Sequence, residues 1–129
     1  MNIIRNIVFI LAVLFSISVL AKRLPPAEVE SVVYAGVRYS VPHWGFENDA
    51  KQNGGYVLAT KIKTDKILWR KRIYKIFYKP AMEKDGQDVF ITALEVLQDE
   101  KSLLITNEKN SQYKLNLETL KVEKLSKNI

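Results

Sequence analysis

The side chains that could do acid–base chemistry are few. Glu83, Asp85 and Asp88 lie close together in the sequence, and His43 is the only histidine. Carboxylates and an imidazole could hydrolyse or cleave a polymer if the fold brought them into one cleft with a raised carboxylate pKa. The same acidic cluster is also typical of a solvated turn, because both the nucleophile turn of a Ser-His-Asp hydrolase and the spacing of an EF-hand calcium loop are absent.

His43 is followed by Trp44 in a loop-like stretch that runs from Pro42 to Gly55. A single histidine in a chain without cysteine makes a poor zinc site, since carboxylates would have to supply the other ligands. We therefore expect no metal and no cofactor. His43 and Trp44 either pack this loop onto the domain or contact a ligand, and the acidic cluster is a second candidate for ligand contact.

A third candidate is a basic hairpin that organises the chain. Its predicted arms, Tyr56 to Ile62 and Ile67 to Tyr78, are rich in β-branched and aromatic residues and flank a polar turn at Thr64-Asp65-Lys66. Arg70 and Arg72 stand among aromatic residues in the second arm, a mixture that suits an acidic polysaccharide or an acidic protein surface. The apolar positions change parity between these two arginines, which predicts a β-bulge there or a strand that bends between two faces.

Short apolar runs between turn signals predict the fold class. Roughly seven or eight strands are expected, which makes the chain all-β: a small antiparallel meander, sandwich or barrel. Asp88 to Leu97 is apolar on both parities, which predicts a central strand. The pattern Ala59-x-Lys61-x-x-Thr64-x-Lys66 is echoed by Lys114-x-Asn116-x-x-Thr119-x-Lys121. Either two copies of one hairpin form or the limited chemistry of turns would explain this echo.

The N-terminus carries a targeting pattern. Arg5 precedes an apolar run from Ile7 to Leu20, and Ala21 ends a small-residue cleavage pattern. An uncleaved membrane anchor is the alternative, although the run is short for a span of about 20 residues. The predicted organisation is a signal peptide at 1–21, an extended proline-containing linker at 22–28 and a single β domain at 29–129.

The amino-acid composition limits the classes of molecule that this protein is expected to bind. The chain has no cysteine, which excludes disulfides and thiol chemistry, and it carries a net charge of +6. Export would make nucleic acid a poor partner, so we expect none. The positive charge either keeps the surface solvated or attracts an envelope protein or an anionic glycan. Contact with a membrane is expected only through the N-terminal segment, if that segment is not cleaved.

Two resemblances accompany this reading. Ala59, Thr64 and Trp69 resemble the A-x-D-x-x-T-G-x-x-x-W pattern of quinoprotein-type β-propeller blades, but Lys61 and Asp65 depart from it. The resemblance implies a shared hairpin form and no quinone cofactor, because a propeller needs typically 4–8 blades. From Leu24 to Leu125 the chain also resembles small exported bacterial proteins without an assigned activity, through LPPAEV, GVRYSVPHWG, QNGGYVLA, LWRKRIY, DVFITALEV and LLITNEKNSQYKLNL.

The sequence thus predicts an exported, non-catalytic binding or interaction module of the bacterial envelope. A small hydrolase or lyase that acts on an envelope polymer is one alternative. An accessory subunit that joins a larger assembly through an edge strand is another.

Overall fold

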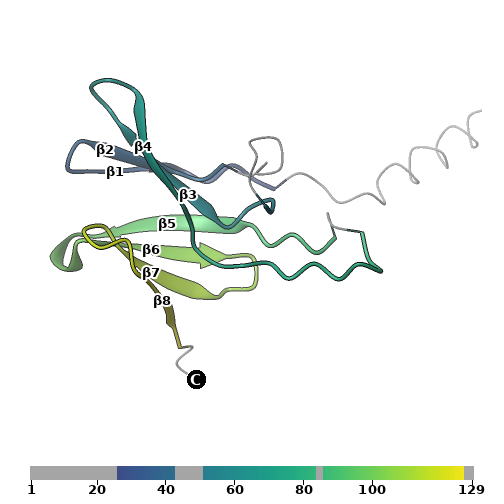
Figure 1. The fold of residues 1–129 in the computed structure, drawn as a ribbon. Helices are drawn as coiled ribbons and strands as arrows, with labels where there is room; N and C mark the ends of the chain where they lie inside the picture. The colour runs from purple at the N-terminus through teal and green to yellow at the C-terminus, as the bar shows by residue number, and fades with distance from the viewer. Residues whose placement is uncertain (1–25, 43–50, 84–85, 127–129) are drawn as a thin grey trace, which may run out of the picture.

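The structure, a computed structural model, describes residues 26–42, 51–83 and 86–126. The predicted signal peptide lies outside these residues, as do His43, Trp44 and Asp85. Eight strands form two four-stranded antiparallel sheets, which confirms the predicted all-β class (Figure 1). Within the described part of the chain, no helix has the length and apolar character needed to cross a membrane.

Each sheet is a simple meander in which every strand pairs with its neighbour in the sequence. The first sheet contains β1 (Val32–Tyr34), β2 (Val37–Ser40), β3 (Tyr56–Lys61) and β4 (Lys66–Arg72). The second contains β5 (Ile91–Leu97), β6 (Ser102–Asn107), β7 (Gln112–Asn116) and β8 (Val122–Leu125), with a short 3-10 helix, η2 (Gln98–Glu100), between β5 and β6.

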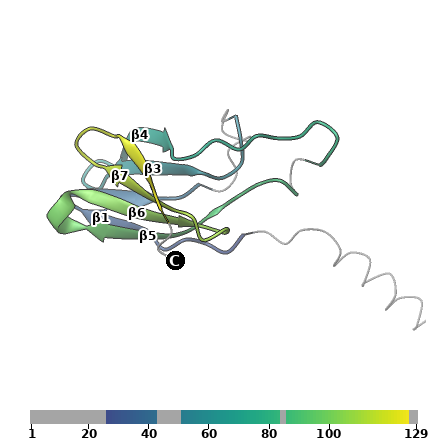
Figure 2. The same ribbon diagram turned by 90° about the horizontal axis from the view of Figure 1, so that it is seen from below.

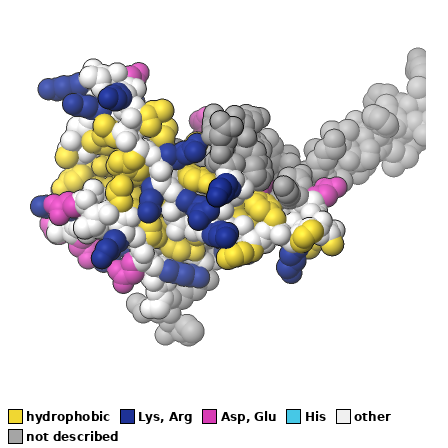
Figure 3. All heavy atoms as spheres, in the orientation of Figure 1, with side chains coloured by type: hydrophobic (Ala, Val, Ile, Leu, Met, Phe, Trp, Pro, Cys, Tyr) yellow, Lys and Arg dark blue, Asp and Glu magenta, His cyan; other side chains and the backbone are white. Residues whose placement is uncertain are grey.

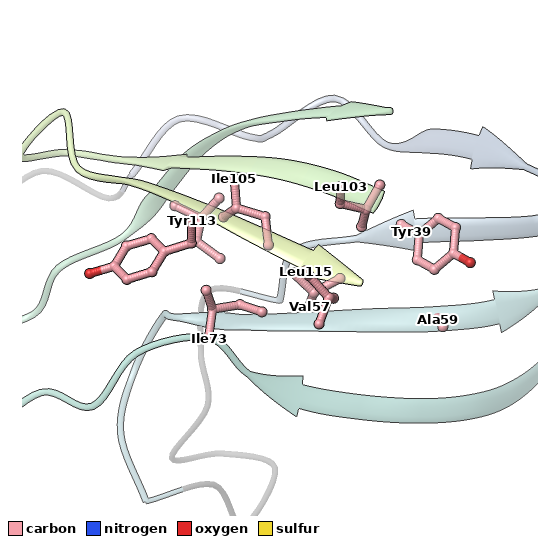
Figure 4. Packing of buried hydrophobic residues seen from close by; sticks show 9 residues of the cluster. Tyr39, Val57, Ala59, Ile73, Leu103, Ile105, Tyr113 and Leu115 are labelled. Carbon is pink, nitrogen blue, oxygen red and sulfur yellow. The ribbon is translucent and has the colours of Figure 1, made fainter. Parts of the chain in front are cut away.

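The core lies between the two sheets. Alternate residues of a strand point to the same face, so β3, β6 and β7 each contribute two buried residues that lie two positions apart. Figure 4 shows these side chains pointing from both sheets into the space between them. Burial of each large apolar side chain contributes about 1.5–3 kcal/mol. The buried members are Tyr39, Val57, Ala59, Ile73, Ile91, Leu103, Ile105, Tyr113 and Leu115.

The second arm of the hairpin differs from its prediction. The bulge lies at Leu68, because Ala59 pairs with Trp69 while Thr60 pairs with Ile67. It was expected nearer the C-terminal end of the strand, which ends at Arg72.

The chain beyond Arg72 leaves the first sheet. The Ile73 N–H donates to the Gly55 carbonyl at 2.7 Å, and the next residue, Tyr74, stacks on Tyr113 of β7 with ring centroids 5.2 Å apart. The parity change therefore marks the point where the chain crosses from one sheet to the other. This is the bend between two faces that the sequence allowed as an alternative.

The predicted central strand is also corrected. β5 begins at Ile91 and lies at one edge of the second sheet, hydrogen-bonded only to β6. It is apolar on both parities because its register shifts between Ile91 and Ala93, so that Ile91 lies in the core and Leu94 and Val96, of the other parity, pack against the same core. A bulge in an edge strand thus produces a pattern that resembles that of a central strand.

The β3–β4 and β7–β8 turns share one form, as the sequence echo predicts. In the first, Asp65 has a φ of 58° and its N–H donates to the Lys61 carbonyl at 2.8 Å. In the second, Leu120 has a φ of 61° and its N–H donates to the Asn116 carbonyl at 2.8 Å. Both turns lie at one end of the molecule, and the segment that connects the sheets lies at the other end (Figures 1 and 2).

Candidate ligand-binding groove

A groove of about 520 Å³ lies between the segment that connects the two sheets and the β6–β7 turn. Its walls combine cationic, apolar and hydrogen-bonding side chains, and Asp88 is the one carboxylate among the described lining residues. The cationic members are Lys75, Lys79, Lys109 and Lys124; the apolar members include Ile76, Phe77, Met82 and Val89; the neutral polar members include Gln87, Asn107 and Ser111.

Gln52 positions one wall of the groove. Its side chain is 2% exposed. Its Nε2 donates to the carbonyls of Tyr74 at 2.8 Å and Gly54 at 3.1 Å, and its Oε1 accepts the Ile76 N–H at 2.8 Å. A side-chain amide therefore takes the place of a neighbouring strand, which keeps the segment after β4 extended although it has left the sheet.

The extended segment presents a cation and an aromatic ring together. Lys75 and Phe77 are both exposed and alternate with Ile76, which is half-buried. The Lys75 ammonium lies 5.0 Å from the centre of the Phe77 ring, which is 77% exposed. An exposed aromatic ring beside a positive charge is an interaction surface for a ligand that has both an anionic group and an apolar face.

Gln87 closes the loop that forms the opposite wall. Its Oε1 accepts the Lys79 N–H, and its Nε2 donates to the carbonyls of Lys79, Met82 and Glu83 at 3.1–3.2 Å. One amide thus holds both ends of the turn, and it brings Lys79 and Met82 to the groove. The sequence predicts a solvated turn for Glu83, Asp85 and Asp88; Glu83 is exposed, as predicted, whereas Asp88 is buried.

Asp88 is held by Tyr78 and Asn53. It is 5% exposed, and the Tyr78 hydroxyl donates to its Oδ1 at 2.6 Å. Asn53 hydrogen-bonds to both members of this pair. Its Nδ2 donates to Asp88 Oδ2 at 3.4 Å, and its backbone N–H donates to the Tyr78 hydroxyl oxygen at 3.2 Å. Burial raises the pKa of Tyr78, and the hydrogen bond to Asp88 raises it further. The phenol therefore stays protonated and remains a donor.

The structure separates the predicted site residues. Asp88 lines the groove, whereas Glu83 is exposed and is absent from the described lining. His43, Trp44 and Asp85 lie outside the described residues, so their convergence with Asp88 remains a prediction.

Arg70 and Arg72 lie on the outer face of the first sheet. They pair with Leu58 and Tyr56, while the intervening Val57 points into the core. The Arg70 guanidinium lies 5.4 Å from the centre of the Tyr56 ring. Neither arginine lines the groove, so the basic hairpin and the groove are two different surfaces.

Sequence reasoning did not find Lys109 and Lys124 as site residues. They lie in the β6–β7 turn and in β8, far along the chain from Lys75 and Lys79. Only the path of the connecting segment brings the four ammonium groups to one groove. No sequence spacing signals this, because the contact depends on how the second sheet docks.

No group of three or more His, Cys, Asp or Glu side chains that could hold a metal ion occurs in the described ranges. Comparisons with protein-family models, curated proteins and solved structures find no match to this chain.

Proposed function

We propose that this protein is an exported, non-catalytic binding module whose groove takes an acidic polysaccharide of the bacterial envelope. One observation carries the proposal. Four lysines line the groove, and the carboxylate among its described lining residues, Asp88, is buried and bonded to Tyr78. The groove therefore concentrates positive charge, which attracts an anionic ligand.

The shape and polarity of the groove favour a polymer chain over a small enclosed ligand. Small-molecule sites bury most of their ligand in a concave, mostly apolar cavity. This groove is open, and it carries an exposed ring at Phe77 for the apolar face of a sugar and ammonium groups that can also donate hydrogen bonds to hydroxyl oxygens. Figure 3 shows Lys and Arg side chains interspersed with hydrophobic ones over one face of the molecule.

Two alternatives receive less support. A hydrolase would need Asp88 as an acid or base, but its carboxylate already accepts a hydrogen bond from Tyr78 that joins the two ends of the 79–87 loop. An accessory subunit would need an open edge strand. The edge strands are β1, β4, β5 and β8, and of these β4 carries positive charges at Lys66, Arg70, Lys71 and Arg72 that oppose strand addition.

Binding is tested by calorimetric titration with oligogalacturonate, a carboxylated sugar polymer, beside a neutral galactan. The test variant is Lys75→Gln with Lys124→Gln, which removes two groove charges. The matched control is Lys101→Gln with Lys121→Gln, which removes two charges from turns of the same sheet that do not line the groove. We expect the groove variant to lose roughly tenfold in affinity and the control to lose less than about twofold.

Three results would overturn the proposal. Equal losses in both variants would mean that binding follows net charge alone. Tighter binding of polyglutamate than of oligogalacturonate would identify an acidic protein surface as the partner. Equal binding of the neutral galactan would remove the role of the lysines. Export is tested separately: mass spectrometry of the protein from the cell envelope is expected to find a chain that begins at Lys22.

A further inference from the structure

The turn between β3 and β4 exposes apolar side chains. Ile67 is 60% exposed, Leu68 46% and Ile62 38%, and all three lie within residues 61–68, here called the hairpin tip. The bulge at Leu68 contributes to this exposure, because an extra residue in β4 takes the strand out of its regular alternation. Figure 1 shows the hairpin tip projecting away from the second sheet.

Positive charges surround these apolar side chains. Lys61, Lys63 and Lys66 are exposed and alternate with them along the hairpin tip, and Asp65 is its one acidic residue. The four strands of the first sheet contain no Asp or Glu at all. The hairpin tip is therefore both apolar and strongly cationic.

The β7–β8 turn provides an internal comparison. It has the same backbone form, but Glu118 and Glu123 stand where the hairpin tip has Lys63 and Leu68. Its apolar residues Leu117, Leu120 and Val122 pack against the core instead of facing solvent. The turn form itself therefore requires neither exposed apolar residues nor a cluster of lysines.

We propose that the hairpin tip docks on the surface of a bilayer that contains anionic lipids. Isoleucine and leucine side chains at a projecting turn can enter the boundary between headgroups and acyl chains, while neighbouring ammonium groups contact lipid phosphates. A protein partner fits less well, because a stable interface needs about 800 Å² from each side and a single turn offers much less.

This inference concerns a surface different from the groove. The groove lies at the end of the molecule that carries the connecting segment, and the hairpin tip lies at the opposite end (Figures 1 and 2). A molecule docked by its hairpin tip would therefore hold its groove away from the bilayer. The two proposals are independent, and either can fail alone.

The absence of cysteine allows a test with one label per molecule. Thr64→Cys places the environment-sensitive fluorophore NBD at the hairpin tip, and Thr119→Cys places it at the equivalent position of the β7–β8 turn. Both residues are exposed. The full-length protein is titrated with vesicles of phosphatidylcholine alone or with 30% phosphatidylglycerol, where the position of the label separates tip docking from attachment through the N-terminus.

We expect a blue shift and a rise in NBD emission at position 64 with the anionic vesicles, and no change at position 119. Lys63→Gln with Lys66→Gln should weaken this response about fivefold for each lysine removed. Ile67→Ser with Leu68→Ser should weaken it about tenfold while the far-ultraviolet circular dichroism spectrum is unchanged. Val33→Ser, which alters an exposed apolar residue on β1, should leave it unchanged.

Several outcomes would overturn the inference. One is an equal response, or none, at positions 64 and 119. Another is an equal response to neutral and anionic vesicles, which would remove the role of the lysines. A third is a response at position 64 to soluble polyglutamate or oligogalacturonate but not to vesicles, which would assign the hairpin tip to a soluble polyanion.

Discussion

The Tyr78 hydroxyl donates a 2.6 Å hydrogen bond to the carboxylate of Asp88, and Asp88 is 5% exposed. This bond joins the two ends of the loop that forms one wall of the groove. A carboxylate found by sequence reasoning as a candidate for ligand contact thus has a structural partner of its own. The hydrogen bond between Tyr78 and Asp88 therefore stabilises this loop and also fixes the shape of the groove wall that the loop forms.

Tyr78→Phe removes the donor and leaves a buried carboxylate with fewer hydrogen bonds. We expect a loss of roughly 1–3 kcal/mol in the free energy of unfolding, measured by urea denaturation. Asp88→Ala should also destabilise the protein. The double variant should lose less than the sum of the two single losses, with a coupling of about 0.5–3 kcal/mol. Additive losses would mean that the pair does not interact in solution.

Gln52→Leu should destabilise the protein through its backbone partners. The substitution leaves the Ile76 N–H and the Tyr74 carbonyl without the amide that now bonds to them. We expect a loss of roughly 1–3 kcal/mol in unfolding free energy and weaker ligand binding, since Lys75 and Phe77 lie on the same segment. Gln87→Leu is the control: its bonds are exposed to solvent, so its loss should stay under about 1 kcal/mol. Equal losses would contradict the bracing role of Gln52.

Gly54→Ala tests a close approach in the groove region. Gly54 has a φ of 79°, and a Cβ there would lie 2.8 Å from a ring carbon of Phe90 and 3.0 Å from the Val89 carbonyl oxygen. Gly36 has a φ of 78° with no heavy atom within 4 Å of such a Cβ. Gly36→Ala should therefore cost about 1 kcal/mol from backbone strain, and Gly54→Ala a further 1–3 kcal/mol from overpacking. Thermal unfolding of the two variants side by side measures the difference, and equal shifts would rule out the steric effect.

Alkaline pH should destabilise the fold through two tyrosines. Burial raises the pKa of Tyr74 and of Tyr78 above the value near 10 that an exposed tyrosine has. The unfolded state therefore loses these protons first, so the stability that they contribute is complete below about pH 10 and is lost as the pH rises further.

Urea unfolding between pH 8 and pH 11.5 measures this loss. Tyr74→Phe should flatten the decline in unfolding free energy with pH, because one shifted group no longer titrates. Absorbance at 295 nm should show a late phase of tyrosine ionisation that is smaller in the variant. A variant whose pH dependence matches that of the parent would contradict the assignment.

Much of the fold could be predicted because its strands and turns are local features. The alternation of Val37, Tyr39 and Val41 and the glycine at position 36 predict the β1–β2 hairpin, which the structure contains. The path of the chain after Arg72 was harder to predict from the sequence. Tyr74, Ile76 and Tyr78 have the composition of a strand, but the partner of that segment is the side chain of Gln52, and no periodicity encodes an amide that replaces a strand.

Only part of the groove could be predicted from the sequence. Asp88 is a predictable site residue because a carboxylate can act as an acid, a base or a ligand. Lys109 and Lys124 have the sequence features of ordinary solvated residues in a turn and an edge strand. Lys109 and Lys124 lie near Lys75 through tertiary packing, which depends on the stacking of Tyr74 on Tyr113. Sequence spacing carries information about neighbours on one strand or hairpin, and it carries little about two surfaces that meet when sheets dock.

The connectivity of the two sheets has a consequence for how the chain folds. Every hydrogen-bonded strand pair joins strands that are consecutive in the sequence, and only the connection between β2 and β3, residues 41–55, is long, so each sheet forms from local pairs. Sandwiches usually fold slowly because their strand pairs are distant in the sequence. Here the distant contacts are those of the shared core, which forms when the two meanders meet. We therefore expect fast folding for an all-β chain of this size, with docking of the two sheets as the limiting step.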